Sequence, residues 1–152
     1  MHAVGTKPKS CSGTFTVYVS KEQADVLLRA LELFFRARSG QLSQLLWELS
    51  TVRNPNGTVT FRPEANDEEA LDGIEAVRSA VFPELLHGES YGVRCDADAG
   101  VAFDIYQTVR HKLAWTLQPN GGMGVSFDEP LFVSSPPHPR CDYKGGGVSD
   151  GR

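Results

Sequence analysis

The pattern of hydrophobic and polar positions changes twice within the first 60 residues. Residues 14–19 alternate Phe and Val with Thr and Tyr, which predicts a β-strand. Ser20 stands three residues before Gln23, the spacing of a capping box, so a helix is predicted to begin after Ser20. Apolar residues then recur every three or four positions, at Leu27, Leu31, Phe34, Phe35, Leu42, Leu45, Leu46 and Leu49. This stripe predicts either one long helix or two helices joined near Gly40.

Turn residues divide the next part of the chain into short elements. Residues 54–57, Asn-Pro-Asn-Gly, are typical of a β-turn and lead into a predicted strand over residues 58–62. Asn66 and Glu69 form a second capping pair at the start of a predicted helix. Its apolar face holds Leu71, Ile74, Val77 and Val81, with Leu85 near the limit that Pro83 sets.

A further helix is predicted from about residue 97, after a short segment, residues 90–93, that fits either a strand or a loop. Asp96 or Asp98 caps this helix. Its predicted buried side holds Val101, Ile105, Val109, Leu113 and either Thr116 or Leu117. A Pro-Asn-Gly-Gly turn ends the helix, and residues 123–127 alternate as a last strand.

The mixture of short strands and helices predicts an α+β fold. We expect a small, mostly antiparallel sheet with three to four helices packed on it. Residues 1–12 are polar and residues 133–152 are rich in Pro and Gly, so both ends are predicted to be extended or mobile tails. A single ligand-binding domain is therefore predicted over residues 13–132.

The composition is that of a globular protein. A chain of 152 residues with 40% hydrophobic content can bury one ordinary core. The N-terminus carries no apolar run of signal-peptide length and no 18 apolar residues follow one another, so we expect a cytoplasmic protein without membrane contact. Cys11, Cys95 and Cys141 form no close pair, which favours free thiols, and we predict neither a metal nor a cofactor.

The net charge of −4 argues against a protein that coats duplex nucleic acid. The acidity is concentrated in residues 64–104, which hold eleven acidic and two basic side chains. Eight arginines and one lysine lie between residues 22 and 138, and guanidinium groups bind phosphate through two parallel N–H donors. The codon usage of a GC-rich genome would produce the same excess of arginine, so the excess alone does not indicate a phosphate site. The net charge excludes a nucleic-acid coat but is compatible with a small phosphate ligand.

Two helix faces carry candidate chemistry. On the helix after residue 97, spacings of three, four and seven bring together Phe103, Tyr106, Gln107 and Arg110, on the side away from the predicted buried one. A similar row on the first helix holds Arg29, Glu32 and Arg36. An aromatic ring stacks on a base and a guanidinium pairs with a phosphate, so either face suits a nucleotide. The alternative for each row is a solvated or dimer-packing face.

His111 is the histidine with the best setting for acid–base chemistry. It has the geometry of a general base if Asp104 or Asp128 orients its ring. The alternative is a half-exposed helix residue that makes one hydrogen bond. No phosphate-binding P-loop and no zinc-protease motif accompanies it.

Two segments resemble small bacteriophage and prophage proteins. Residues 30–36, Ala-Leu-Glu-Leu-Phe-Phe-Arg, with Gly-Gln at 40–41, resemble an ALELYSR…GQ helix. Residues 103–115, FDIYQTVRHKLAW, with Phe-Asp-Glu-Pro at 127–130, resemble a YDLYQVIRHKLAW…DEP segment. The set resembles the phage anti-Thoeris sponges, which bind cyclic ADP-ribose isomers without hydrolysing them. Some of these assemble as dimers and hexamers and also trap cyclic oligonucleotides.

The resemblance implies a non-enzymatic protein that sequesters a cyclic nucleotide immune signal in the host cytoplasm, as a homodimer or higher homo-oligomer. The ligand-binding residues we predict are Arg36, Tyr91, Tyr106, Arg110, His111, Phe127 and Asp128. In this hypothesis Arg36 and Arg110 contact phosphates, the aromatic rings stack on adenine or line the pocket, and Asp128 accepts from a ribose hydroxyl. The alternatives are a phage inhibitor or adaptor that binds a host protein, and a small nucleotide hydrolase built on His111 and Asp128.

Overall fold

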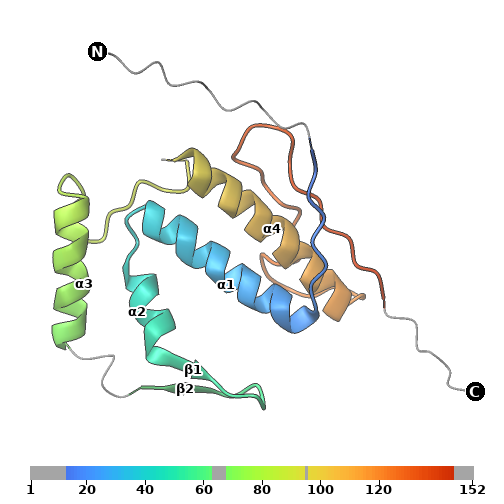
Figure 1. Cartoon of the computed structure of the whole chain (residues 1–152), viewed down its shortest axis with the longest axis horizontal. Helices are drawn as coiled ribbons and strands as arrows, with labels where there is room; N and C mark the ends of the chain where they lie inside the picture. Colours follow the sequence, from blue (N-terminus) through green and yellow to red (C-terminus); the bar gives the residue numbers. More distant parts are fainter. Residues whose placement is uncertain (1–12, 63–67, 95, 146–152) are drawn as a thin grey trace, which may run out of the picture.

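The computed structural model describes residues 13–62, 68–94 and 96–145, and the chain has an α+β fold (Figure 1). Within these ranges the elements follow in the order α1 (Lys21–Arg38), α2 (Ser43–Ser50), β1 (Thr51–Arg53), β2 (Val59–Phe61), α3 (Glu68–Val81) and α4 (Ala97–Leu117). The two strands pair antiparallel. The predicted class is confirmed, although the sheet is a single hairpin at the edge of the molecule rather than a platform for the helices.

Helices α1 and α4 lie side by side and form the core (Figure 1). Phe35 of α1 is 5% exposed, and its ring meets those of Phe103 and Tyr106 edge-on, at 5.3 and 5.4 Å between centroids. Ala99 and Ala102 of α4 are also buried, and their short side chains allow the helices to approach closely. Edge-to-face ring pairs add about 0.5–1.5 kcal/mol each beyond the area they bury.

The face of α4 that packs against α1 differs from the predicted one. Val101, predicted to be buried, is 48% exposed, whereas Phe103 and Tyr106 from the predicted open face pack on the core. The remaining aliphatic positions of the predicted side are only half-buried, namely Ile105, Val109 and Leu113. Aromatic rings bury more apolar area than valine, which explains why the core contains them.

Asp104 holds the C-terminal part of the chain on α4. Its carboxylate is fully buried and accepts hydrogen bonds from the backbone N–H groups of Val133 and Ser134, at 2.8 and 3.0 Å, and from the Ser134 hydroxyl. Bonds of this charge-assisted kind compensate for burying a carboxylate. The segment after residue 132, predicted to be an extended or mobile tail, is therefore fixed to α4 where it begins.

Gly40 separates α1 from α2, which decides between the one-helix and two-helix interpretations. Its φ of 85° lies in the left-handed region that commonly ends a helix. A Cβ atom at this position would lie 2.6 Å from Cδ1 of Leu85, so the chain also approaches Leu85 closely here. At the other end of α1, Ser20 and Gln23 form the predicted capping box through bonds of 3.2 and 2.8 Å.

Only one of the three predicted strands is present in the described part of the structure. Residues 58–62 contain β2 as expected, but its partner β1 was not predicted. The predicted strands over residues 14–19 and 123–127 are wrong: the first is exposed chain without a sheet partner among the described residues, and the second forms bends and turns. Residues 90–93 form a loop.

Helix α3 occurs where it was predicted, although its proposed capping residue Asn66 lies outside the described residues. The apolar face predicted to be buried is largely exposed, at Leu71, Val77 and Val81. Arg78 is buried instead, where it donates to the carbonyl oxygen of Leu86 at 2.6 Å and pairs with Glu75 at 3.0 Å. This side of α3 is held by polar contacts.

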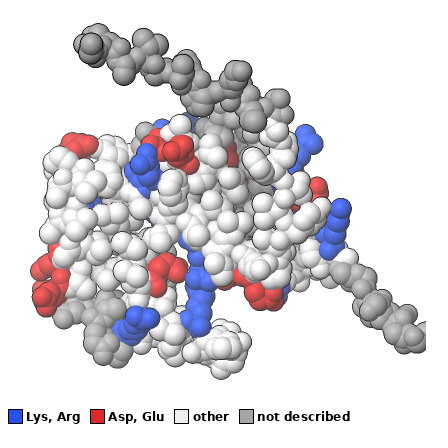
Figure 2. Space-filling view, viewed as in Figure 1, with Lys and Arg blue, Asp and Glu red and all other residues white. Residues whose placement is uncertain are grey.

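The surface is rich in uncovered apolar groups. In the described part of the chain, six hydrophobic residues are buried and twenty-four large hydrophobic residues are exposed. Figure 2 shows one face on which charged side chains of both signs are scattered among a larger uncharged area. Among the described helices, none is long and apolar enough to cross a membrane.

Candidate functional site

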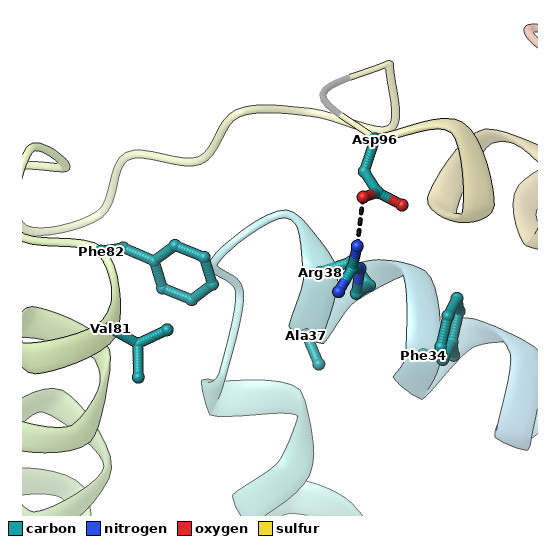
Figure 3. Close-up of a pocket in the computed structure, with 6 residues that line it drawn as sticks. All are labelled: Phe34, Ala37, Arg38, Val81, Phe82 and Asp96. Atoms are coloured by element: carbon teal, nitrogen blue, oxygen red, sulfur yellow. Dashed lines mark hydrogen bonds and ion pairs between the residues drawn. The ribbon is translucent and has the colours of Figure 1, made fainter. Parts of the chain in front are cut away.

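A groove opens where the C-terminal ends of α1 and α3 meet the N-terminus of α4 (Figure 3). It has a volume of about 420 Å³ and is lined by Phe34, Ala37, Arg38, Val81, Phe82 and Asp96. Four of these side chains are apolar and two are charged. Its volume falls in the range of about 300–1,000 Å³ that is typical of small-molecule sites, but the groove is shallow and open to solvent rather than enclosed.

The charged part of the groove is an ion pair between two helix termini. Arg38 is the last residue of α1, and its guanidinium donates to the carboxylate of Asp96, the N-cap of α4 (Figure 3). Asp96 also accepts from the backbone N–H groups of Asp98 and Ala99, at 2.9 and 3.0 Å. The Arg38 hydrogen bond, followed by the bond from Ala99, holds the pKa of Asp96 below its ordinary value, so this carboxyl is charged at neutral pH.

The apolar walls of the groove come from different helices. Phe34, on α1, is 44% exposed, and Phe82 stands opposite it just after α3 (Figure 3). The Phe82 ring packs edge-on against Tyr91, at 6.0 Å between centroids. Tyr91 therefore supports the Phe82 side of the groove from behind.

Predicted ligand residues Arg36 and Tyr91 belong to the network behind this groove. The backbone N–H of Tyr91 donates to the carbonyl oxygen of Ser39 at 3.0 Å, which fixes the loop after α3 to the end of α1. Arg36 donates to the side-chain oxygen of Gln41 at 2.7 Å, and Gln41 donates in turn to the Ser90 hydroxyl at 3.1 Å. Both predicted residues thus position the groove without lining it.

Arg110 and Tyr106 lie along the α1–α4 contact. The guanidinium carbon of Arg110 is 5.2 Å from the centroid of Tyr106, and Arg110 also donates to Gln107 and to the carbonyl oxygen of Val125, the latter at 3.1 Å. On the α1 side, Arg36 lies over Phe35 at 5.9 Å. Two packed rings, Phe35 and Tyr106, therefore stand between the two arginines that were predicted to contact phosphates.

The remaining predicted residues lie near the C-terminal end of α4. Trp115 donates to the carbonyl oxygen of Phe127 at 3.2 Å and packs edge-on against its ring at 5.6 Å. His111 meets Trp115 at 6.3 Å, and its buried Nδ1 has no hydrogen-bond partner among the described residues. Asp128 is exposed. No hydrogen bond joins His111 to Asp128 in the described part of the chain, so the structure does not show the His111–Asp128 pair on which the hydrolase hypothesis was built.

Residues 88–92 read Gly-Glu-Ser-Tyr-Gly, which matches the spacing of a serine-hydrolase nucleophile elbow. That motif works only on a sharp turn between a strand and a helix. Here the segment is a loop after α3, and Ser90 accepts a hydrogen bond from Gln41. The partner of the Ser90 hydroxyl is therefore the Gln41 amide, which cannot act as a general base.

None of the six residues that line the groove was in the predicted ligand set, including the four that carry its chemistry, Phe34, Arg38, Phe82 and Asp96. Arg38 and Asp96 are 58 positions apart in the sequence, and only the packing of α1 beside α4 brings them together. Phe34 lay within the apolar stripe of the first helix, where its neighbour Phe35 has the same spacing. Nothing local in the sequence tells the exposed ring from the buried one.

Comparison of the chain with protein-family models, with curated proteins and with solved structures finds no match. Among the described residues, no group of three or more His, Cys, Asp or Glu side chains is placed to hold a metal ion. The case for a function therefore depends on the groove itself and on the two segments that resemble phage proteins.

Proposed function

We propose that the protein is a non-enzymatic binding protein that sequesters a small nucleotide signal in the groove beside Arg38. One observation carries the proposal: the groove combines two phenylalanine rings, Phe34 and Phe82, with the guanidinium of Arg38, which lies between them (Figure 3). A nucleotide offers the same combination, a flat base and an anionic phosphate. Bases stack on aromatic rings, and arginine binds phosphate through two parallel N–H donors.

In the proposed complex the base lies between Phe34 and Phe82, and a phosphate takes the place of the Asp96 carboxylate on Arg38. Asp96 keeps its bonds to the first turn of α4, so exchange of the arginine partner does not uncap the helix. Asp96 then acts as an internal competitor for the phosphate. We expect Asp96→Asn, which retains a capping side chain, to tighten phosphate-dependent binding.

The resemblance to anti-Thoeris sponges supplies the first ligand to test, a cyclic ADP-ribose isomer, with cyclic oligonucleotides as the second. In this role the protein is a phage anti-defence factor that keeps the signal from its host effector. Sequestration requires slow release without bond cleavage. Arg36 and Tyr91 support the site from behind, whereas Arg110, His111, Phe127 and Asp128 lie outside it.

A thermal-shift screen with recovery of the ligand tests the proposal. A ligand present at 100 times its Kd stabilises the folded state by about 2.7 kcal/mol, so the melting temperature is expected to rise with the cyclic ADP-ribose isomer. Heating the complex should then release the isomer intact, as read by mass spectrometry. Recovery of linear ADP-ribose would mean catalysis, and no shift with any cyclic nucleotide would reject the nucleotide ligand.

The exposed apolar surface favours a second candidate, an inhibitor or adaptor that binds a host protein. Large exposed apolar surfaces commonly mark protein–protein contact sites. This candidate predicts that Val77→Asp, on the exposed face of α3, abolishes anti-defence activity while Arg38→Ala has no effect. The sequestration proposal predicts the opposite pair of results.

A further inference from the structure

Residues 14–19 have the pattern of a strand but no sheet to join. Phe15 is 97% exposed and Val17 75% exposed, and together with Val19 they lie on one side of an alternating pattern. Within the described ranges, no backbone hydrogen bond holds residues 14–19. An apolar strand left in this state lacks both the burial and the backbone pairing that its sequence is suited to.

The β1–β2 hairpin, in turn, has an edge along β2 that is unpaired among the described residues. Asn54 donates its N–H to Thr58 and Arg62 donates to Ser50, so the even-numbered positions of β2 face its partner. The backbone groups of Val59 and Phe61 consequently point to the open edge, as alternation along an antiparallel ladder requires. Both side chains are exposed, and the Phe61 ring continues the apolar surface of Trp47 at 5.1 Å. A two-stranded hairpin is only marginally stable without a third strand.

The strand of one chain does not reach its own hairpin. Figure 1 shows residues 13–20 leaving the start of α1 in the direction away from the hairpin. We infer that residues 14–19 pair with the β2 edge of a second copy of this chain, and that the second copy returns its own strand to the first. The result is a twofold dimer held by strand addition, in which Phe15, Val17 and Val19 extend the apolar face of Val59 and Phe61.

The reciprocal exchange covers enough surface for a stable dimer. Two fully exposed Phe15 rings and two half-exposed Phe61 rings supply roughly 450–750 Å², given about 150–250 Å² for a fully buried ring. Six valines and four strand backbones bring the total into the range of about 1,200–2,000 Å² found in stable interfaces. The same contact would cover part of the apolar surface that the single chain exposes.

Light scattering coupled to size-exclusion chromatography tests this inference on the full-length chain without ligand. Wild-type protein is expected to elute with at least twice the 16.6 kDa mass of one chain. Val17→Asp and Val59→Asp, which place a carboxylate in the strand and on the edge respectively, should each halve that mass or reduce it further. Met123→Asp, at a fully exposed position outside both elements, should leave it unchanged.

Circular dichroism should show that each variant keeps its helices, because none of the three positions lies in the α1–α4 core. A monomeric wild-type protein would overturn the inference, and so would a strand that folds back on its own hairpin, which also gives a monomer. An assembly that survives Val59→Asp but not Val17→Asp would place the strand on another surface and reject the hairpin edge. None of these outcomes depends on the proposed ligand, so either proposal can fail alone.

Discussion

Two neighbouring phenylalanines on α1 show how much of the account depends on single residues. Phe35 is enclosed by Phe103 and Tyr106, whereas Phe34 stands on the wall of the groove. We expect Phe35→Ala to lower the free energy of unfolding by about 3–5 kcal/mol, since it leaves a cavity in the core. Phe34→Ala should lower it by about 1 kcal/mol or less and weaken nucleotide binding. Urea unfolding and calorimetry measure the two effects, and equal loss of stability would contradict the assignment.

Gly40 gives a second prediction at the scale of one residue. Gly40→Ala adds a Cβ in a left-handed conformation and 2.6 Å from Leu85, so we expect the free energy of unfolding to fall by about 2–4 kcal/mol. Gly57→Ala is the matched control, since Gly57 has a φ of 83° but nothing within 4 Å of the added atom. Its cost is the backbone strain alone, about 1–2 kcal/mol. Equal losses in urea unfolding would show that the contact with Leu85 is unimportant.

At the scale of elements, helix caps and turns were predictable from the sequence, whereas the neighbour against which each strand or helix packs was not. The Ser20 capping box and the Asn-Pro-Asn-Gly turn depend on residues within a few positions of each other, so spacing was enough to find them. The strands predicted over 14–19 and 123–127, both within the described ranges, are absent from the single chain, because alternation shows only that a segment is suited to a strand and not that the same chain supplies a neighbour. The prediction of which face of α4 is exposed was wrong, because the side chains of α1 decide whether the valine face or the aromatic face of α4 packs against it.

Asp104 gives a prediction about how one element holds another. Asp104→Asn replaces an acceptor of three bonds with a group that has one acceptor oxygen, so we expect a loss of about 1.5–3 kcal/mol in the free energy of unfolding. The segment from residue 133 should also become sensitive to protease, because its backbone donors lose their partner. Asp98→Asn, an exposed change on the same helix, is the control. Unchanged proteolysis in Asp104→Asn would contradict the anchoring role.

Asp96 makes the stability of the α4 N-terminus depend on pH. The pKa of Asp96 is lowered in the folded chain, chiefly by Arg38, so the stabilisation it provides is complete above its ordinary pKa and is lost as the pH falls below about 4. Asp96→Asn keeps the cap but has no charge to titrate. We expect the melting temperature of the wild type to fall more steeply than that of the variant between about pH 5 and pH 2.5. Parallel curves would show that the ion pair contributes nothing.

At the scale of the whole molecule, the predicted ligand residues are distributed over α1, α4 and the loops before and after α4 rather than gathered in one pocket. Arg36 and Tyr91 stand behind the groove, Arg110 lies further along α4, and Phe127 follows α4 and packs against its Trp115. The groove is lined by an arginine and by aromatic residues, the same residue types as in the predicted ligand set, but by different members of those types. The sequence could not identify which ones, because Arg38 and Phe82 become neighbours only when α3 and α4 pack around the end of α1.

Isothermal titration of a cyclic ADP-ribose isomer into wild-type protein, Arg38→Ala and Arg53→Ala tests the central claim most directly. Arg53 is an exposed arginine on β1, outside the groove, and so provides the matched control. We expect saturable binding to wild type and Arg53→Ala with the same Kd, and binding at least about tenfold weaker to Arg38→Ala, as loss of a charge-assisted pair worth about 1.5–3 kcal/mol requires. Undiminished binding to Arg38→Ala, or binding lost equally in both variants, would contradict the groove as the site.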